Sequence, residues 1–170
     1  MKKSCIVILD PRGVVLSGGD DVIKRHHSYA QDLAEESKGK KISLLILSAS
    51  NSHINIYQLE NLQIKSISNP TFNAYNFAKK AFQAIKNLDV KLLVVGDPWE
   101  SFWSAKILSK YLPSKVPIQV QLHGDIASPA WRKISLHNNL RYLVAKFSLP
   151  KASGIRAVSS IQSQLITKAS

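Results

Sequence analysis

The sequence predicts an α/β fold with a doubly wound, mostly parallel sheet of six to seven strands and helices on both faces. Short and nearly continuous aliphatic runs are typical of strands that are buried on both faces. These runs alternate with longer amphipathic segments, as they do in a parallel sheet covered by helices. The length of 170 residues and the 45% hydrophobic content fit one globular domain with a substantial core.

Six aliphatic runs are expected to form the strands, at 5–9, 42–47, 64–67, 92–95, 118–122 and 154–158. The stretch 48–68 is polar and repeats Asn and Ser, and it has room for one further short strand near 54–57. Strands in this order, with helices between most of them, predict a Rossmann-like sheet.

Four amphipathic segments are expected to form helices, over 20–37, 72–86, 102–112 and 134–149. Asp20 and Asp21 favour the amino end of the first helix through capping and the helix dipole. A short final helix is expected after Ser159-Ser160. The apolar positions that recur at helical spacing are Val22, His26, Tyr29 and Leu33, then Phe72, Tyr75, Ala78, Phe82 and Ile85, then Phe102, Ala105, Leu108 and Leu112, and finally Ile134, Leu140, Leu143, Val144 and Phe147.

The formal net charge is +12, from 23 basic and 11 acidic residues. An excess of this size attracts polyanions, such as nucleic acid, an anionic membrane face or a phosphorylated substrate. A solvated lysine-rich surface accounts for it as well. Long blocks of lysine or arginine are absent from the sequence, which argues against a disordered tail that binds nucleic acid.

Cys5 is the only cysteine, which excludes an internal disulfide and a cysteine metal cluster and favours a reducing cytoplasm. No run of eighteen apolar residues is present, so no segment is expected to span a membrane. The apolar start of the chain is too short for an export signal and ends at Asp10-Pro11-Arg12, so we interpret it as the first strand. These features predict a cytoplasmic protein.

The residues that follow the strands are the first candidates for a site, because ligands of open α/β sheets bind beyond the carboxyl ends of the strands. His123-Gly124-Asp125 directly follows the fifth run and brings an imidazole, a hinge and a carboxylate to one place. Gly18-Gly19 precedes the first helix, where bare backbone N–H groups can approach an anion. A plain turn is the alternative for the glycine pair, which belongs to neither a dinucleotide fingerprint nor a Walker loop.

Other strand ends carry polar residues with weaker signals. Asp97 and Glu100 are expected to cap the helix that follows them, while Trp99 and Trp103 line a groove or belong to the core. Ser159, after the last strand, is explained equally well as a helix cap. His26 is expected to be packed and hydrogen-bonded and His27 exposed, and no metal is expected, because the two are not spaced as ligands on one helix face.

The order and location of several segments resemble the amino-terminal, acceptor-side domain of retaining glycosyltransferases of family 4, which forms one half of the two-domain GT-B fold. The segments are Gly18-Gly19 after the first strand, the helix sequence 25–34, His123-Gly124-Asp125 at a strand end, and the stretch 149–159, in which a long helix leads into the last strand. The resemblance runs along most of the chain. It implies that 1–170 is a single domain and that the C-terminal nucleotide-sugar-binding domain is absent from it.

The resemblance implies transfer of a sugar from a nucleotide-sugar donor to a glycan or lipid-linked acceptor, with retention, in a hexosyltransferase-type enzyme. The chain alone is then expected to be inactive, and whether it is an enzyme by itself stays open. Gly18 and Gly19 would contact the donor phosphate and His123 would bond the donor sugar. Asp125 would orient His123 or touch an acceptor hydroxyl. The residues implied to line the acceptor cleft are Asp97, Trp99 and Ser159. No metal or other cofactor is implied.

The fourth helix offers a membrane contact. The basic residues within or beside this helix, in the segment after His123, stand among Trp131, Leu143 and Phe147, as in a helix that rests on the anionic inner face of a membrane. The alternative is a core-packing helix with a charged outer face. The basic residues are Arg132, Lys133, Arg141, Lys146 and Lys151.

Two other functions are open on the sequence. A basic α/β module for nucleic acid or another polyanion is supported by the charge but by no recognition motif, so nucleic acid is not the expected partner. A flavodoxin-like signalling or cofactor domain is suggested by Asp10 after the first strand. It lacks a matching second aspartate, a strand-end lysine and a flavin phosphate loop.

Overall fold

The computed structural model describes residues 2–37, 41–50, 57–69, 73–124, 126 and 128–157. Its centre is a seven-stranded sheet in the order β3-β4-β2-β1-β5-β6-β7, in which β3 is antiparallel to β4 and all other neighbours are parallel. This confirms the predicted fold class. The strands are β1 (Ser4–Asp10), β2 (Ile42–Ser50), β3 (Tyr57–Gln58), β4 (Leu62–Ser68), β5 (Asp89–Val95), β6 (Ile118–Leu122) and β7 (Gly154–Ala157).

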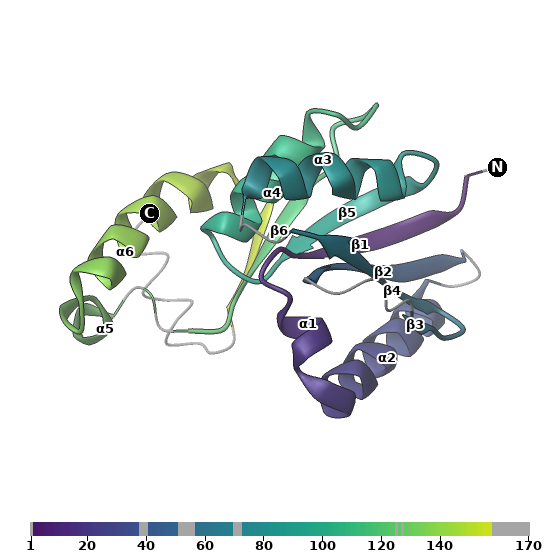
Figure 1. Ribbon diagram of the computed structural model, residues 1–170, viewed down its shortest axis with the longest axis horizontal. Coiled ribbons are helices and arrows are strands. Elements are labelled where there is room, and N and C mark those ends of the chain that lie inside the picture. The colour runs from purple at the N-terminus through teal and green to yellow at the C-terminus, as the bar shows by residue number, and fades with distance from the viewer. Residues whose placement is uncertain are drawn as a thin grey trace.

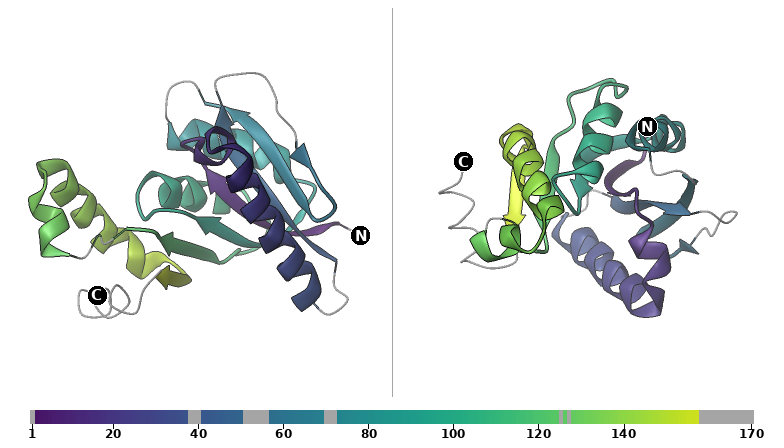
Figure 2. Two further views of the ribbon diagram at one scale, coloured as in Figure 1. Left: turned by 90° about the horizontal axis from the view of Figure 1, so that it is seen from below. Right: turned by 60° about the vertical axis from the view of Figure 1, so that its left-hand side comes forward.

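The helices form a layer on each face of the sheet (Figure 1). On one face, α1 (Val14–Ser17) and α2 (Gly19–Glu36) pack over β2 and β4. On the other face, α3 (Ala74–Ile85) and α4 (Glu100–Ser109) cover the larger core. The remaining helices, α5 (Pro129–Lys133), α6 (Leu136–Ser148) and the 3-10 turn η1 (Leu149–Lys151), project beyond β6 and β7 at one end of the molecule (Figure 2).

The central strands explain why the aliphatic runs are nearly continuous. In β1, Val7 and Leu9 are fully buried towards α3 and α4, while Ile6 and Ile8 pack towards α2. β2 is buried from Leu44 to Ala49, because helices cover both of its sides. A strand in this position needs apolar side chains at every place rather than at alternate places.

The buried stripes of two helices differ from the predicted ones. In α2, Ala30 is fully buried whereas Tyr29 is 46% exposed. In α3, Phe77 and Ala81 are fully buried beside Ala78 and Ile85, whereas Tyr75 is 52% exposed and Phe82 is only partly buried. Alanines allow a helix to lie close to the sheet, so they occupy the inner face where the periodicity had placed tyrosines. The α4 stripe through Phe102, Ala105 and Leu108 is confirmed.

Several boundaries also differ. The predicted short strand near 54–57 overlaps β3 only at Tyr57, and 54–56 lie outside the described residues. α1 and α5 are helices of four and five residues, too short to give a periodic signal. α6 begins at Leu136 rather than at 134 because the Ser135 hydroxyl caps it by accepting from the Asn138 N–H. Phe72 and the segment 158–170, with the predicted final helix, lie outside the described residues.

A turn at the end of β1 depends on Gly13, whose N–H donates to the Asp10 carbonyl. Its φ is 74°, and a Cβ added there would lie 2.3 Å from the Ala49 carbonyl oxygen of β2.

We expect Gly13→Ala to lower the free energy of unfolding by about 3 kcal/mol, through left-handed strain and the clash together. Gly19 is the matched control. Its φ is 72° with nothing within 4 Å of an added Cβ, so Gly19→Ala should cost only about 1 kcal/mol. Urea unfolding of both variants measures the difference, and equal losses would contradict it.

Candidate functional site

The candidate site lies at the edge of the sheet where β1, β5 and β6 end, which we call the carboxyl edge. From β1 the chain first continues to β2 and β4 on one side, and then returns to form β5, β6 and β7 on the other side. The order therefore reverses between β1 and β5, and this is the switch point at which open α/β sheets bind ligands. The loops that begin at Asp10 and Gly96 meet there.

Asp10 secures the loop after β1. Its Oδ2 accepts hydrogen bonds from the Ser48 hydroxyl and the Val15 backbone N–H, both at 2.7 Å. These two bonds tie the first turn of α1 to the end of β2. The carboxylate that had suggested a flavodoxin-like signalling or cofactor domain thus has a structural task.

Gly18 and Gly19 are both exposed and join α1 to α2. Gly18 precedes the first residue of an 18-residue helix, whose positive dipole end and free N–H groups attract anions. Asp20 and Asp21 occupy the same first turn and compete for that attraction. An anion at this place would therefore have to bind on the glycine side of the turn.

His123 is the first residue after β6 and is exposed. Because β1, β5 and β6 are parallel neighbours (Figure 1), His123, directly after β6, lies at the same edge as the loop that leads from β1 to the glycine pair. His123 thus follows directly on a strand, as predicted, and its contact with a donor sugar stays a prediction. Asp125 and Ser159 lie outside the described residues, so their roles stay predictions.

Asp97 caps α4, as predicted. Its Oδ1 accepts from the backbone N–H groups of Trp99 at 2.8 Å and Ser101 at 3.2 Å, and its Oδ2 accepts from the Ser101 hydroxyl. The residue is only 8% exposed. These bonds fix the turn after β5, and contact of Asp97 with an acceptor stays a prediction.

Arg12 is a residue of the edge that the sequence prediction missed. Its Nη2 lies 2.5 Å from Glu100 Oε2 and 3.5 Å from Asp97 Oδ2, so it bridges the loops after β1 and β5. Burial raises the pKa of Glu100, but hydrogen bonds from its own backbone N–H and from Arg12 outweigh burial and lower it overall. The pair therefore remains charged at neutral pH. A single arginine 88 positions from its partner gives no local signal in the sequence.

Trp99 joins the carboxyl edge to α5 and α6. Its Nε1–H donates to the Arg141 carbonyl at 2.6 Å, and its ring stacks on Trp131 with centroids 6.2 Å apart and planes 8° from parallel. The Arg141 guanidinium lies 4.7 Å from the centre of the Trp99 ring. Trp103 packs edge-on against Phe102 in the core. Both tryptophans therefore have packing roles, and contact of Trp99 with an acceptor stays a prediction.

His26 is packed and hydrogen-bonded, as predicted. Its Nδ1 lies 2.7 Å from the Val22 carbonyl, and its ring meets Tyr29 edge-on. His27 is half-buried, so its predicted exposure was wrong. Among the described residues, no group of three His, Cys, Asp or Glu side chains could hold a metal ion.

Comparison with known proteins gives a structural match. No family model and no curated protein matches the chain. Among solved structures, sucrose-phosphate synthase from Thermosynechococcus elongatus matches with a TM-score of 0.63 at 12% sequence identity. The match covers 98% of this chain and 45% of that enzyme, so the chain spans less than half of its length. At this identity the likeness shows the fold alone: a Rossmann-like half of a GT-B glycosyltransferase fold.

His26 should make the stability depend on pH. Burial lowers its pKa below the ordinary 6.5, and nearby Arg25 also lowers it, although the hydrogen bond to Val22 acts in the other direction. At a pH between the pKa of His26 in the folded protein and its pKa in the unfolded chain, the unfolded chain binds more protons. The free energy of unfolding should therefore fall as the pH drops through 6.5. Urea unfolding at pH 7.5 and at about pH 5.5 should show a smaller loss for His26→Gln than for the natural chain. The exposed His137 is the control, and a similar change in His137→Gln would contradict the assignment.

Proposed function

We propose that this chain is the acceptor-side domain of a retaining, family 4-like glycosyltransferase. The enzyme would move a sugar from a nucleotide-sugar donor to a glycan or a lipid-linked acceptor. One observation supports the proposal: the exposed His123 follows β6 at the carboxyl edge, and the loop after β1 leads from the same edge through α1 to the exposed glycine pair, in a sheet with the form of half a GT-B fold. A second, nucleotide-binding domain would form the opposite wall of the cleft.

The proposed chemistry assigns separate tasks to the two groups. Sugar transfer passes through an oxocarbenium-like state while the nucleoside diphosphate departs. Backbone N–H groups at Gly18 and Gly19 would stabilise the negative charge of the departing diphosphate. His123 would hydrogen-bond the donor sugar near the reacting carbon and hold it in position. Closure of the two domains would exclude water that otherwise hydrolyses the donor. The proposal includes no metal and no other cofactor.

The acceptor would enter from the loops after β5, β6 and β7. Asp97 and Trp99 stand after β5, and their bonds to α4 and α6 hold this part of the edge rigid. Asp125 and Ser159 follow β6 and β7 in the chain and belong to the same proposal. Arg12, whose side chain is 36% exposed, adds a guanidinium between the loops after β1 and β5.

The test requires the protein that contains this chain together with its nucleotide-sugar-binding domain. In that protein we expect His123→Ala to lower kcat by about 10²- to 10³-fold, because one positioned donor to the transition state is lost. His27→Ala is the matched control, since His27 lies in the middle of α2 and should leave kcat unchanged.

A structure of the same protein with a nucleotide sugar checks the assignment directly. The sugar should lie next to His123, with the diphosphate towards Gly18 and Gly19. A donor sugar bound elsewhere would contradict the proposal. Steeply salt-dependent binding to DNA or RNA without any donor binding would favour the polyanion-binding alternative instead.

A further inference from the structure

α6 presents an apolar stripe to the outside of the molecule. Leu136, Leu140, Leu143 and Phe147 follow one another at intervals of three or four residues, which places them on one side of the helix. The core-packing alternative for this side of the helix is wrong for the described residues. The stripe consists of Ile134 (75% exposed) at the end of α5 and Leu136 (78%), Leu140 (54%), Leu143 (50%), Val144 (38%) and Phe147 (68%) of α6.

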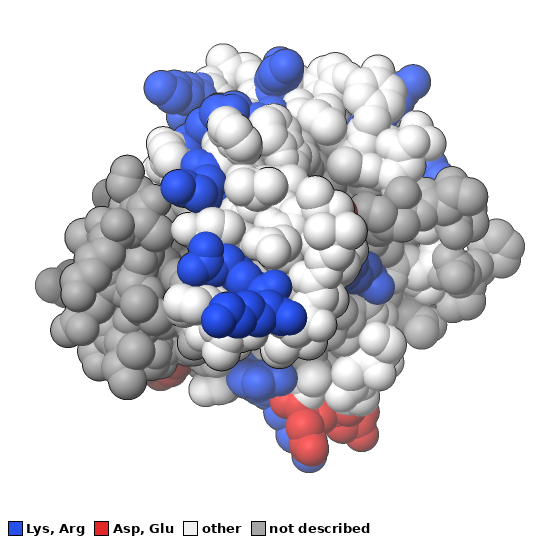
Figure 3. All heavy atoms as spheres, turned by 90° about the vertical axis from the view of Figure 1, so that its left-hand side faces the viewer, with Lys and Arg blue, Asp and Glu red and all other residues white. Residues whose placement is uncertain are grey.

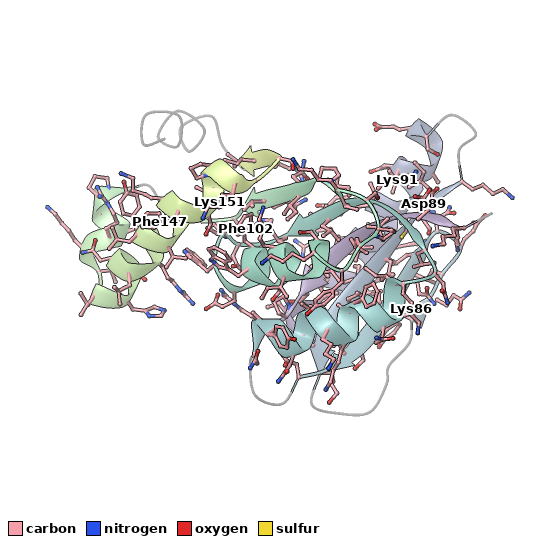
Figure 4. The ribbon with its side chains drawn as sticks, turned by 90° about the horizontal axis from the view of Figure 1, so that it is seen from above. Lys86, Asp89, Lys91, Phe102, Phe147 and Lys151 are labelled. Atoms are coloured by element: carbon pink, nitrogen blue, oxygen red, sulfur yellow. The ribbon has the colours of Figure 1, made fainter. Side chains whose placement is uncertain are left out.

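The opposite side of α6 is the one that packs. Ala145 is 2% exposed and Ser148 is fully buried, and the Arg141 carbonyl accepts the bond from Trp99. Small residues and a backbone group thus fix the helix against the rest of the domain, and the large apolar side chains point away from it. Figure 4 shows Phe147 on α6 at one end of the molecule, with Asp89 and Lys91 at the other end of the sheet.

The segment of the chain that carries the stripe is rich in basic residues and poor in acidic ones. Residues 101–170 hold ten basic residues and one acidic residue, so nine of the twelve net positive charges lie in this part of the chain. Figure 3 shows basic side chains gathered over the end of the molecule where α5 and α6 lie. Between 126 and 157 there is no Asp or Glu, and the basic residues are Arg132, Lys133, Arg141, Lys146, Lys151 and Arg156. Lys133 and Lys146 are exposed and directly precede Ile134 and Phe147 of the stripe in the chain.

We propose that the α5–α6 face, formed by this stripe with Lys133 and Lys146, docks on an anionic lipid bilayer. A helix with an apolar side and flanking cations lies in the membrane interface, with the apolar side chains among the acyl chains and the cations at the head groups. No helix of the described residues is long and apolar enough to cross a membrane. The proposed contact is a peripheral one, with α6 parallel to the surface.

The chemistry of the face favours a bilayer over other occupants. A second copy of the chain would bring the same cations together across a two-fold interface, where like charges repel. A nucleic acid would be attracted to the cations but would leave the apolar stripe in water. An anionic bilayer satisfies both the stripe and the cations. This proposal does not depend on the proposed sugar transfer.

Binding to vesicles tests the proposal with the 170-residue chain. We expect the chain to sediment with vesicles of phosphatidylcholine that contain about one third phosphatidylglycerol, and to remain in solution with phosphatidylcholine alone. The double variant Lys133→Gln/Lys146→Gln should weaken the partition coefficient about thirty-fold at low salt, from the loss of two cations near the surface. Phe147→Ser should weaken it about tenfold through the loss of an inserted ring.

Control variants keep the same chemistry at another place. Lys79→Gln/Lys110→Gln removes two exposed cations from the α3–α4 side, and Tyr75→Ser removes an aromatic side chain that is 52% exposed on α3. These variants should bind as the natural chain does. All substituted side chains are exposed, so circular dichroism should show a folded protein in each case.

Site-specific labelling locates the contact. The natural Cys5 should not react with a maleimide, because its side chain is only 1% exposed. Burial, together with the nearby Asp89, also raises the pKa of its thiol to about 11. An environment-sensitive fluorophore on Leu143→Cys should brighten and shift to the blue with anionic vesicles. The same fluorophore on Lys79→Cys should not change.

The contrary outcomes are distinct. Equal binding to neutral vesicles, or equal losses in the control variants, overturns the proposal. Concentration-dependent dimers that Phe147→Ser abolishes, without vesicle binding, identify a second copy of the chain as the occupant. Binding to DNA that falls in Lys133→Gln/Lys146→Gln but not in Phe147→Ser identifies a polyanion. Each of these results leaves the test of His123 and the donor sugar unaffected.

Discussion

The parallel pairing of β1 with β5, and of β5 with β6, determines which residues share the candidate site. In the observed register Leu9 is level with Val95, and Val95 with Val120, so the three strands end together at one edge. Neighbouring strands are about 4.8 Å apart, so the ends of β1 and β6 are separated by only about 10 Å. If β6 ran antiparallel, His123 would stand at the opposite edge of the sheet. The order and direction of the strands thus bring His123 to the edge from which the loop after β1 leads to the glycine pair.

Polar contacts at the edge convert this proximity into a fixed geometry. Asp10 ties α1 to β2, Asp97 begins α4, and Arg12 spans the two loops through Glu100. Carboxylates that accept several N–H and O–H groups hold loops firmly, because removing one partner leaves a charge without its bonds. A site whose reacting groups come from different strands needs loops that are held in fixed positions in this way.

The strands were predictable because their burial on both faces demands continuous aliphatic runs. α4 was predictable for a similar reason, since Phe102, Ala105 and Leu108 are spaced for one buried side. The inner faces of α2 and α3 were less predictable, because periodicity does not tell whether Ala30 or Tyr29 lies against the sheet. That choice depends on the distance between helix and sheet, which is a property of the packed structure.

The candidate site was predictable where a strand end and a residue type coincide, as at His123. Arg12 and Gly13 gave no such signal. The partner of Arg12 is 88 positions away, and Gly13 is required by the approach of the Ala49 carbonyl from β2. Such requirements arise from contacts between distant segments, and a single sequence contains no pattern that announces them.

The contacts of Trp99 connect the carboxyl edge with the outward face of α6. The Trp99–Arg141 bond and the stack on Trp131 fix the rotation of α6 about its axis, and Ala145 fills the small space beneath it. Turning the helix by half a turn would bury the apolar stripe, but it would also force Leu140 and Phe147 into the space that Ala145 and Ser148 occupy. Overpacking of that kind lowers the stability of the fold, whereas the small residues fit closely. The exposure of the stripe is therefore a consequence of the same packing that holds the loop after β5. For this reason, a bilayer surface that fixes the orientation of α6 would also fix the orientation of the candidate site.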